Sequence, residues 1–257
     1  MTTVTLQKYL TASEKGPWAN SYDRWRNDNL TNRYQGVQFG YTSAGRYTSW
    51  NDIWNYYGFK ERDVLPGDYK YEDWNGDGEI NGQDEHPFAF DQTPWLQFSL
   101  NAGLQWKNFD FNMLLQGSAL GSMEYKEPLH EIWGKNGGGA LTQFLDRWHP
   151  VDPKADPYDP STVWTSGHYA YTGRWAKNNS AFNRVSTAYL RLKSIELGYT
   201  FPKLKQIPNA SLRVYANAYN LLTFTGVKFV DPEHPDDDLG RMYPLNKTYT
   251  LGVSLSF

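Results

Sequence analysis

Twelve consecutive residues in the first third of the chain carry the oxygen-bearing side chains of a cation site. Ligand-type residues occupy the first, third, fifth and twelfth positions, and glycine occupies the sixth; these residues are Asp73, Asn75, Asp77, Asp84 and Gly78. The backbone carbonyl of Glu79 would add a seventh-position ligand. This is the spacing of an EF-hand calcium loop, and hard oxygen ligands on a flexible loop favour Ca²⁺ over Mg²⁺. We expect a structural calcium site closed by Asp84 or Glu85; the alternative is an Asp- and Gly-rich turn that binds no ion.

No group of residues has the spacing of a catalytic centre. The chain has no cysteine, which excludes thiol catalysis, disulfides and thiolate metal sites. Its five histidines do not form an HExxH motif, and no nucleophile, base and orienting group occur in a recognisable pattern. We therefore expect no enzymatic activity.

Aromatic residues collect in the long segment between about residues 120 and 187. The candidates for ligand contact are Trp133, Trp148, Trp164, Trp175, Tyr169 and Tyr171. Such rings, next to Asp and Asn side chains, could stack on a glycan or a peptide. They could equally form a small core of the loop itself, and the sequence leaves both interpretations open.

Five segments alternate between apolar and polar residues, which is the pattern of β-strands with one polar face. They span about 95–106, 109–119, 188–201, 211–224 and 249–257. In the first, Leu96, Phe98 and Leu100 share one face, and Gln97 and Ser99 share the other. The fold class is therefore all-β, with a further strand conceivable near residues 4–10.

The connections between these segments alternate between short and very long. They measure about 2, 68, 8 and 22 residues, and a long segment precedes the first strand. Outer-membrane barrels have short periplasmic turns and long extracellular loops, and they need at least about eight strands. We expect 1–94 to be mainly extracellular loop, 95–119 a hairpin, 120–187 a long extracellular loop and 188–257 the last three strands. Five or six strands would form only part of a larger barrel.

Composition agrees with a membrane-embedded barrel wall. The chain has 257 residues, of which 17% are Phe, Trp or Tyr, although its mean hydropathy is −0.71. Aromatic girdles around an apolar band, combined with wet loops, would give this balance. The net charge of −3 gives no reason to expect nucleic-acid binding. No apolar run reaches the about 18 residues of a membrane-spanning helix.

Several ordered motifs between about residues 33 and 257 resemble the SusC/RagA family of TonB-linked outer-membrane transporters of Bacteroidetes. The residues that carry the resemblance are Pro66–Asn81 (PGDYKYEDWNGDGEIN), Tyr189–Pro202 (YLRLKSIELGYTFP), Asn217–Gly226, Asp231–Glu233, Tyr243–Pro244 and Lys247–Phe257. The resemblance implies the C-terminal part of a 22-stranded barrel with an N-terminal plug that is missing from this chain. It also implies uptake of glycans or peptides together with a SusD-like lipoprotein, with energy delivered by TonB through the missing N-terminal part. Phe257 resembles the terminal signal for membrane insertion.

On this interpretation the chain lies in the outer membrane, contacts lipid with its apolar face and is inactive as an isolated fragment. The alternative is a secreted, soluble carbohydrate-binding β-domain with a calcium-stabilised loop. It would use the same aromatic residues and the same segment from Asp73 to Asp84.

Overall fold

The chain folds into two compact units in a computed structural model. The sheet unit lies within residues 92–122, 186–235 and 241–257, and the loop unit lies within 1–91, 123–185 and 236–240. The structure describes residues 36–56, 64–126, 129–130, 132, 141–171, 179–202, 210–233, 242–243 and 245–257. The conceivable strand near residues 4–10 lies outside them. Among the described residues, no helix is both long and apolar enough to span a bilayer.

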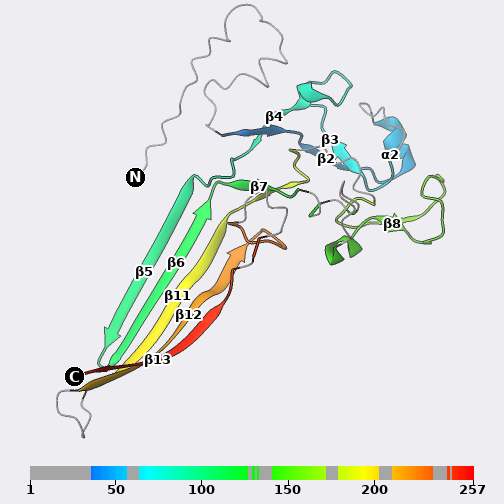
Figure 1. The fold of residues 1–257 in the computed structure, drawn as a ribbon. Coiled ribbons are helices and arrows are strands. Elements are labelled where there is room, and N and C mark those ends of the chain that lie inside the picture. The colour runs from blue at the N-terminus through cyan, green and yellow to red at the C-terminus, as the bar shows by residue number, and fades with distance from the viewer. Residues whose placement is uncertain are drawn as a thin grey trace, which may run out of the picture. The chain divides into compact units, whose positions relative to one another are not determined.

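Five long strands form the sheet unit, and each is antiparallel to its neighbours. They are β5 (Leu96–Trp106), β6 (Phe109–Ala119), β11 (Tyr189–Phe201), β12 (Ser211–Thr225) and β13 (Thr248–Ser256). They lie side by side in chain order from β5 to β13 (Figure 1). The five predicted strands are confirmed, with ends that differ by about one residue.

Both short connections and the C-terminus lie at one end of this sheet. Trp106 pairs with Phe109 across the two-residue turn, and Phe109 pairs with Tyr199 of β11. At the same end, Ser211 of β12 pairs with Ser256 of β13. The long connections therefore leave from the opposite end, as the alternation of loop lengths predicted.

The two faces of the sheet differ sharply in polarity because directly paired residues point to the same side. Leu100, Leu197, Val214 and Val253 lie on the apolar face, which the register makes continuous across all five strands. Many of its side chains are open: Leu251 is 85% exposed and Leu104 is 65% exposed. The opposite face carries amides, hydroxyls and charged groups.

The remaining elements are short. They are β1 (Gln38–Gly40), β2 (Ser43–Arg46), α2 (Trp50–Asn55), β3 (Tyr69–Tyr71), η2 (Gly82–Asp84), β4 (His86–Ala89), β7 (Ser122–Glu124), η3 (Thr142–Leu145), β8 (His149–Pro150), β9 (Trp164–Thr165) and β10 (Arg184–Ser186). β1 pairs with β4, β2 with β3, β7 with β10 and β8 with β9. The six-residue helix α2 begins where the Ser49 hydroxyl accepts the Asp52 amide.

Aromatic side chains form two packed clusters in the loop unit. Tyr41, Tyr69 and Tyr71 are buried together with Ala170, and Phe182 packs against them. A second cluster is made by the buried residues Tyr47, Ile53 and Val64, with Trp50 and Tyr56 at its edge. Each buried aromatic ring removes a large apolar surface from water, so these clusters help to stabilise a unit whose strands are short.

We expect the two faces of β13 to differ in their tolerance of charge. On the expectation that this face meets lipid, Leu251→Arg should destabilise the membrane-inserted protein by about 2–4 kcal/mol, because it places a guanidinium against hydrocarbon near mid-strand. Thr250→Arg, on the polar face beside Asn217, is the matched control and should cost far less. Urea unfolding of the protein in lipid vesicles measures both. Equal costs would contradict a lipid-facing apolar side.

Candidate functional site

The Asp73–Asp84 segment is a tight loop held by its own carboxylates. Asp73 accepts hydrogen bonds from the backbone amides of Gly76, Asp77 and Gly78 at 2.7, 3.2 and 2.8 Å. Gly76 and Gly78 have positive φ values of 76° and 85°, which glycine adopts without steric cost. The chain therefore turns sharply at Gly78, where the calcium-loop pattern predicted a turn.

Asp84 is the buried centre of this loop, with no exposed surface. Its Oδ1 accepts the amides of Trp74 and Asn75 at 2.9 and 3.3 Å, and its Oδ2 accepts the amide of Asn81 at 2.8 Å. Burial raises the pKa of the Asp84 carboxyl, and these three amides oppose the shift. Asp84 thus ties the start of the loop to its end.

The predicted calcium ligands share one loop, but their oxygens are largely engaged by protein groups. The Asn75 amide nitrogen donates to Asp77 Oδ2 at 2.9 Å, and Glu79 is exposed. Among the described residues, no three Asp, Glu or His side chains are gathered closely enough to hold a metal ion. The calcium site stays a prediction.

Four of the six predicted ligand-binding aromatic residues lie in the described part of the chain, and all four are partly buried. Trp164 packs edge-on against Tyr171 at 5.5 Å, and Tyr169 packs edge-on against Phe144 at 4.8 Å. Trp148 lies over Gly67, where an added Cβ would meet its ring at 2.2 Å. These contacts favour the interpretation that the rings form the loop's own core.

The other two predicted aromatic residues, Trp133 and Trp175, lie outside the described residues. Phe257 is 96% exposed at the chain end. Contact of these aromatic residues with ligand and the insertion role of Phe257 stay predictions.

A buried acid, Asp68, lies beside the calcium-type loop in sequence and was not singled out by sequence reasoning. Its side chain is 1% exposed, and its Oδ2 accepts the Leu65 amide at 2.9 Å. Burial raises the pKa of the Asp68 carboxyl to about 7, against the Leu65 hydrogen bond and the Arg46 charge. The Arg46 guanidinium donates to the Gly67 carbonyl at 2.8 Å and lies 4.7 Å from the Tyr69 ring centre.

A second buried ionisable residue is Arg191 of β11, which lies on the polar face of the sheet unit and is 1% exposed. Arg191 donates to Asp231 at 2.6 Å, to Glu233 at 2.7 Å and to the Thr223 hydroxyl at 3.0 Å. The Tyr189 hydroxyl also donates to Glu233, at 2.6 Å. The connection that follows β12 is thereby fixed to the wall of the sheet.

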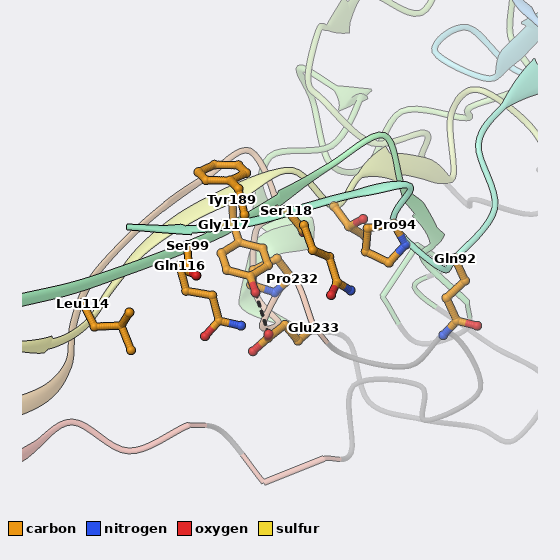
Figure 2. A pocket seen from close by; sticks show the side chains of 13 residues that line it. Gln92, Pro94, Ser99, Leu114, Gln116, Gly117, Ser118, Tyr189, Pro232 and Glu233 are labelled. Carbon is orange, nitrogen blue, oxygen red and sulfur yellow. Dashed lines mark hydrogen bonds between the residues drawn. The ribbon is translucent and has the colours of Figure 1, made fainter. Parts of the chain in front are cut away.

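This network borders a pocket of about 610 Å³ on the polar side of the sheet unit. Figure 2 shows the Tyr189 hydroxyl meeting the Glu233 carboxylate at the edge of this space, with Gln116 and Leu114 farther along β6. Gln97, Ser99 and Ser118 complete much of its polar floor. Sequence reasoning placed Gln97 and Ser99 on the polar face, but not Tyr189. It missed the pocket because residues 231–233 are distant in the sequence from β5 and β6.

A second network of ion pairs on the polar face is centred on Arg213 and lies nearer the end of the sheet with the short turns. Arg213 of β12 donates to Asp110 of β6 through Nε at 3.1 Å and again through Nη2. Arg213 also donates to Glu196 of β11 at 2.6 Å. Gly198 leaves room for this crossing, because an added Cβ would lie 2.5 Å from Asp110 Oδ1.

Curated relatives match most of the chain. TonB-dependent receptors P3 and P26 of Formosa agariphila are 28% identical over 76% of the chain and 27% identical over 87% of it. TonB-dependent receptor SusC of Bacteroides thetaiotaomicron is 26% identical over 80% of the chain. The chain spans only 19%, 22% and 19% of these relatives' lengths, respectively. No protein-family model matches the chain.

Solved structures share the fold. The RagAB peptide transporter aligns with a TM-score of 0.58 at 21% identity, over 88% of this chain and 23% of the other. The RagAB peptide importer in its open-open state aligns with a TM-score of 0.53 at 20% identity, over 87% of this chain and 22% of the other. The predicted SusC/RagA resemblance, all-β barrel-wall fold and outer-membrane location are confirmed by these relatives.

We expect Asp84→Asn to loosen the calcium-type loop. An amide can accept with only one of its two terminal atoms, so the Asn81 amide or the Trp74 and Asn75 amides lose their acceptor. Each unsatisfied buried donor costs about 1–3 kcal/mol. Hydrogen–deuterium exchange of the 73–84 amides in the full-length receptor should accelerate accordingly. The exposed Glu79→Gln is the control, and equal exchange in both variants would contradict the role given to Asp84.

We expect the loop unit to lose stability as the pH rises from about 4 to about 7. The folded Asp68 keeps its proton up to about pH 7, whereas an unfolded Asp releases it near pH 3.9. Over that range unfolding therefore releases a proton, and higher pH favours it. Above about pH 7 this contribution is constant.

Hydrogen–deuterium exchange of residues 64–72, corrected for the intrinsic pH dependence of exchange, measures the effect. Asp68→Asn should remove the dependence of loop-unit stability on pH. Any stability lost to the buried amide is a constant amount that does not change with pH. Asp52→Asn is the control, because it removes the carboxylate paired with Lys70 at 2.7 Å and should leave the slope in place. A slope that survives in Asp68→Asn would show that another group titrates.

Proposed function

Because the chain is related over most of its length to TonB-dependent receptors of the SusC and RagA kind, we propose that it forms wall and loops of an outer-membrane nutrient importer. Its cargo is a polar oligomer, either a glycan or a peptide. The isolated chain does not transport, because five strands do not enclose a pore. The observation that carries this proposal is the two-faced sheet.

The apolar face of the sheet suits a bilayer better than water. Soluble proteins rarely leave large continuous apolar patches open, yet this face runs across five strands with side chains such as Leu251, Leu104 and Val253 well exposed. A soluble carbohydrate-binding domain would have to cover that face with another layer. Lipid covers it without further protein, and the polar face is then left to line a wet lumen.

The proposed partners follow from the relatives. The structural relative RagAB is a peptide importer, and the relatives in sequence are TonB-dependent receptors. By analogy, a SusD-like lipoprotein would cover the outer loops, and TonB would supply energy through parts of the receptor beyond this chain. Both assignments rest on fold and sequence similarity.

We also propose that the Asp73–Asp84 loop holds a structural Ca²⁺ ion. Its support is the ligand spacing together with the turn at Gly78, which has a φ of 85°. To coordinate the ion, the carboxylate oxygens of Asp84 would have to give up hydrogen bonds that they now accept from backbone amides. The ion would stiffen the loop and would take no part in chemistry.

We expect deletion of the gene for the full-length receptor to abolish uptake of its cargo. Uptake of fluorescent oligosaccharide and peptide pools by the deletion strain and the wild type measures this. Collapse of the proton-motive force in wild-type cells should have the same effect, because TonB-linked transport needs it. Unchanged uptake in the deletion strain, or recovery of the receptor in the soluble fraction, would contradict the importer and favour the carbohydrate-binding domain.

We expect calorimetry on the full-length receptor to show one calcium-binding event that Asp77→Ala weakens. Glu79→Gln should leave it intact, because position seven of such a loop binds through the backbone carbonyl. The absence of binding at millimolar calcium would remove the ion without affecting the importer proposal.

A further inference from the structure

The pocket on the polar face of the sheet unit is acidic. Glu233 is the only charged residue among the described residues that line it. Its side chain is 40% exposed, whereas that of its partner Arg191 is 1% exposed. Asp231 and Glu233 together outweigh the single charge of Arg191. A ligand in the pocket therefore meets a carboxylate, with the guanidinium hidden behind it.

The Glu233 carboxylate is fixed in position and still has capacity to accept. One oxygen accepts the Tyr189 hydroxyl at 2.6 Å and the other accepts Arg191 at 2.7 Å. A carboxylate offers about four lone-pair positions, so both oxygens retain a free direction. Because its partners hold it in place, little side-chain freedom is lost when a ligand binds.

Neutral acceptors surround this carboxylate. The side-chain amides of Gln97 and Gln116 and the hydroxyl of Ser99 line the same pocket, and each carries an oxygen that can accept a hydrogen bond. Ser118 Oγ and Thr187 Oγ1 have no hydrogen-bond partner among the described residues, but both oxygens lack solvent-accessible surface, so a ligand in the pocket does not reach them.

No open aromatic surface is available on the polar side of this pocket among its described lining residues. Tyr189 is 7% exposed, and the Arg191 guanidinium lies 5.1 Å from its ring centre. The register places the other aromatic lining residue, Phe98, on the apolar face together with Gly117. Stacking on a sugar ring would thus contribute little, and recognition would depend on charge and hydrogen bonds.

We propose that this pocket binds a primary ammonium group of the imported oligomer, with Glu233 as its counter-ion and the side-chain oxygens of Gln97, Ser99 and Gln116 as further acceptors. An ammonium has three donors and no acceptor, which matches a carboxylate surrounded by hydroxyl and amide oxygens. The ammonium belongs to an amino sugar or to a lysine side chain. This inference rests on the proposed importer function, since it names the chemistry of the cargo.

Calorimetry on the purified full-length receptor in detergent tests the proposal without requiring transport. The peptide probes are acetyl-Ser-Lys-Ser-amide and its norleucine and glutamate counterparts. The sugar probes are the glucosamine trimer and its fully N-acetylated form. At least one ammonium probe should bind about tenfold more tightly than its neutral counterpart, and the glutamate peptide should bind least. Whether the peptide or the amino sugar shows the gain identifies the source of the ammonium.

Two variants that each remove one negative charge separate a local contact from a general field. Glu233→Gln should erase the tenfold preference for ammonium. Asp231→Asn should retain it, because Asp231 pairs with Arg191 at 2.6 Å but does not line the pocket. Gln116→Leu removes a neutral acceptor of the lining, so it should reduce ammonium binding by a smaller factor.

Equal binding of charged and neutral probes, or no binding of any probe at millimolar concentration, would overturn the ammonium site. Equal losses in Glu233→Gln and Asp231→Asn would also overturn it, in favour of a diffuse negative potential. None of these results touches the importer proposal, which depends on uptake by whole cells.

Discussion

The pairing register of the five long strands is the constraint on which the rest of the molecule depends. A slip of one residue would move every apolar side chain to the polar face, and unpaired backbone groups in hydrocarbon cost several kcal/mol each. The register is nonetheless irregular at one level of the sheet. Lys193 is an extra residue on β11 relative to β6, and β12 has a further extra residue between Tyr219 and Leu222. At this level Asn220 adopts a positive φ of 53°, which Asn tolerates better than most residues.

That irregularity also marks what the sequence could and could not predict. Alternation predicted both ends of β6 and the shared face of Leu96, Phe98 and Leu100 on β5. It did not predict that the alternation shifts by one residue at Lys193. Before Lys193 the even-numbered residues Leu190 and Leu192 lie on the apolar face, whereas after it the odd-numbered residues do. A bulge leaves no trace in residue type alone, since it depends on which neighbouring residue each backbone group pairs with.

The functional residues were less predictable than the strands of the sheet, because they too depend on partners that are distant in the sequence. The calcium-loop spacing located a real turn, yet it could not show that Asp84 directs both oxygens to backbone amides. Asp68 and Arg191 carried no local pattern, because burial and long-range partners define them. Arg191 is held by residues 40 and 42 positions later in the chain. Only the fold brings such groups together, whereas a strand can be predicted from its own residues.

The distribution of charge separates the role of the wall from that of the loops. On the polar face each arginine is held by two carboxylates: Arg213 by Asp110 and Glu196, and Arg191 by Asp231 and Glu233. Both groups therefore leave an excess of one negative charge. The Pro66–Asn81 signature of the loop unit is instead used internally, since Gly67 accommodates Trp148, Arg46 binds the Gly67 carbonyl and Asp73 closes the turn. The signature segment therefore serves the internal packing of the loop unit. Under the proposed importer function, selectivity for cargo would lie with the acceptor-rich polar wall.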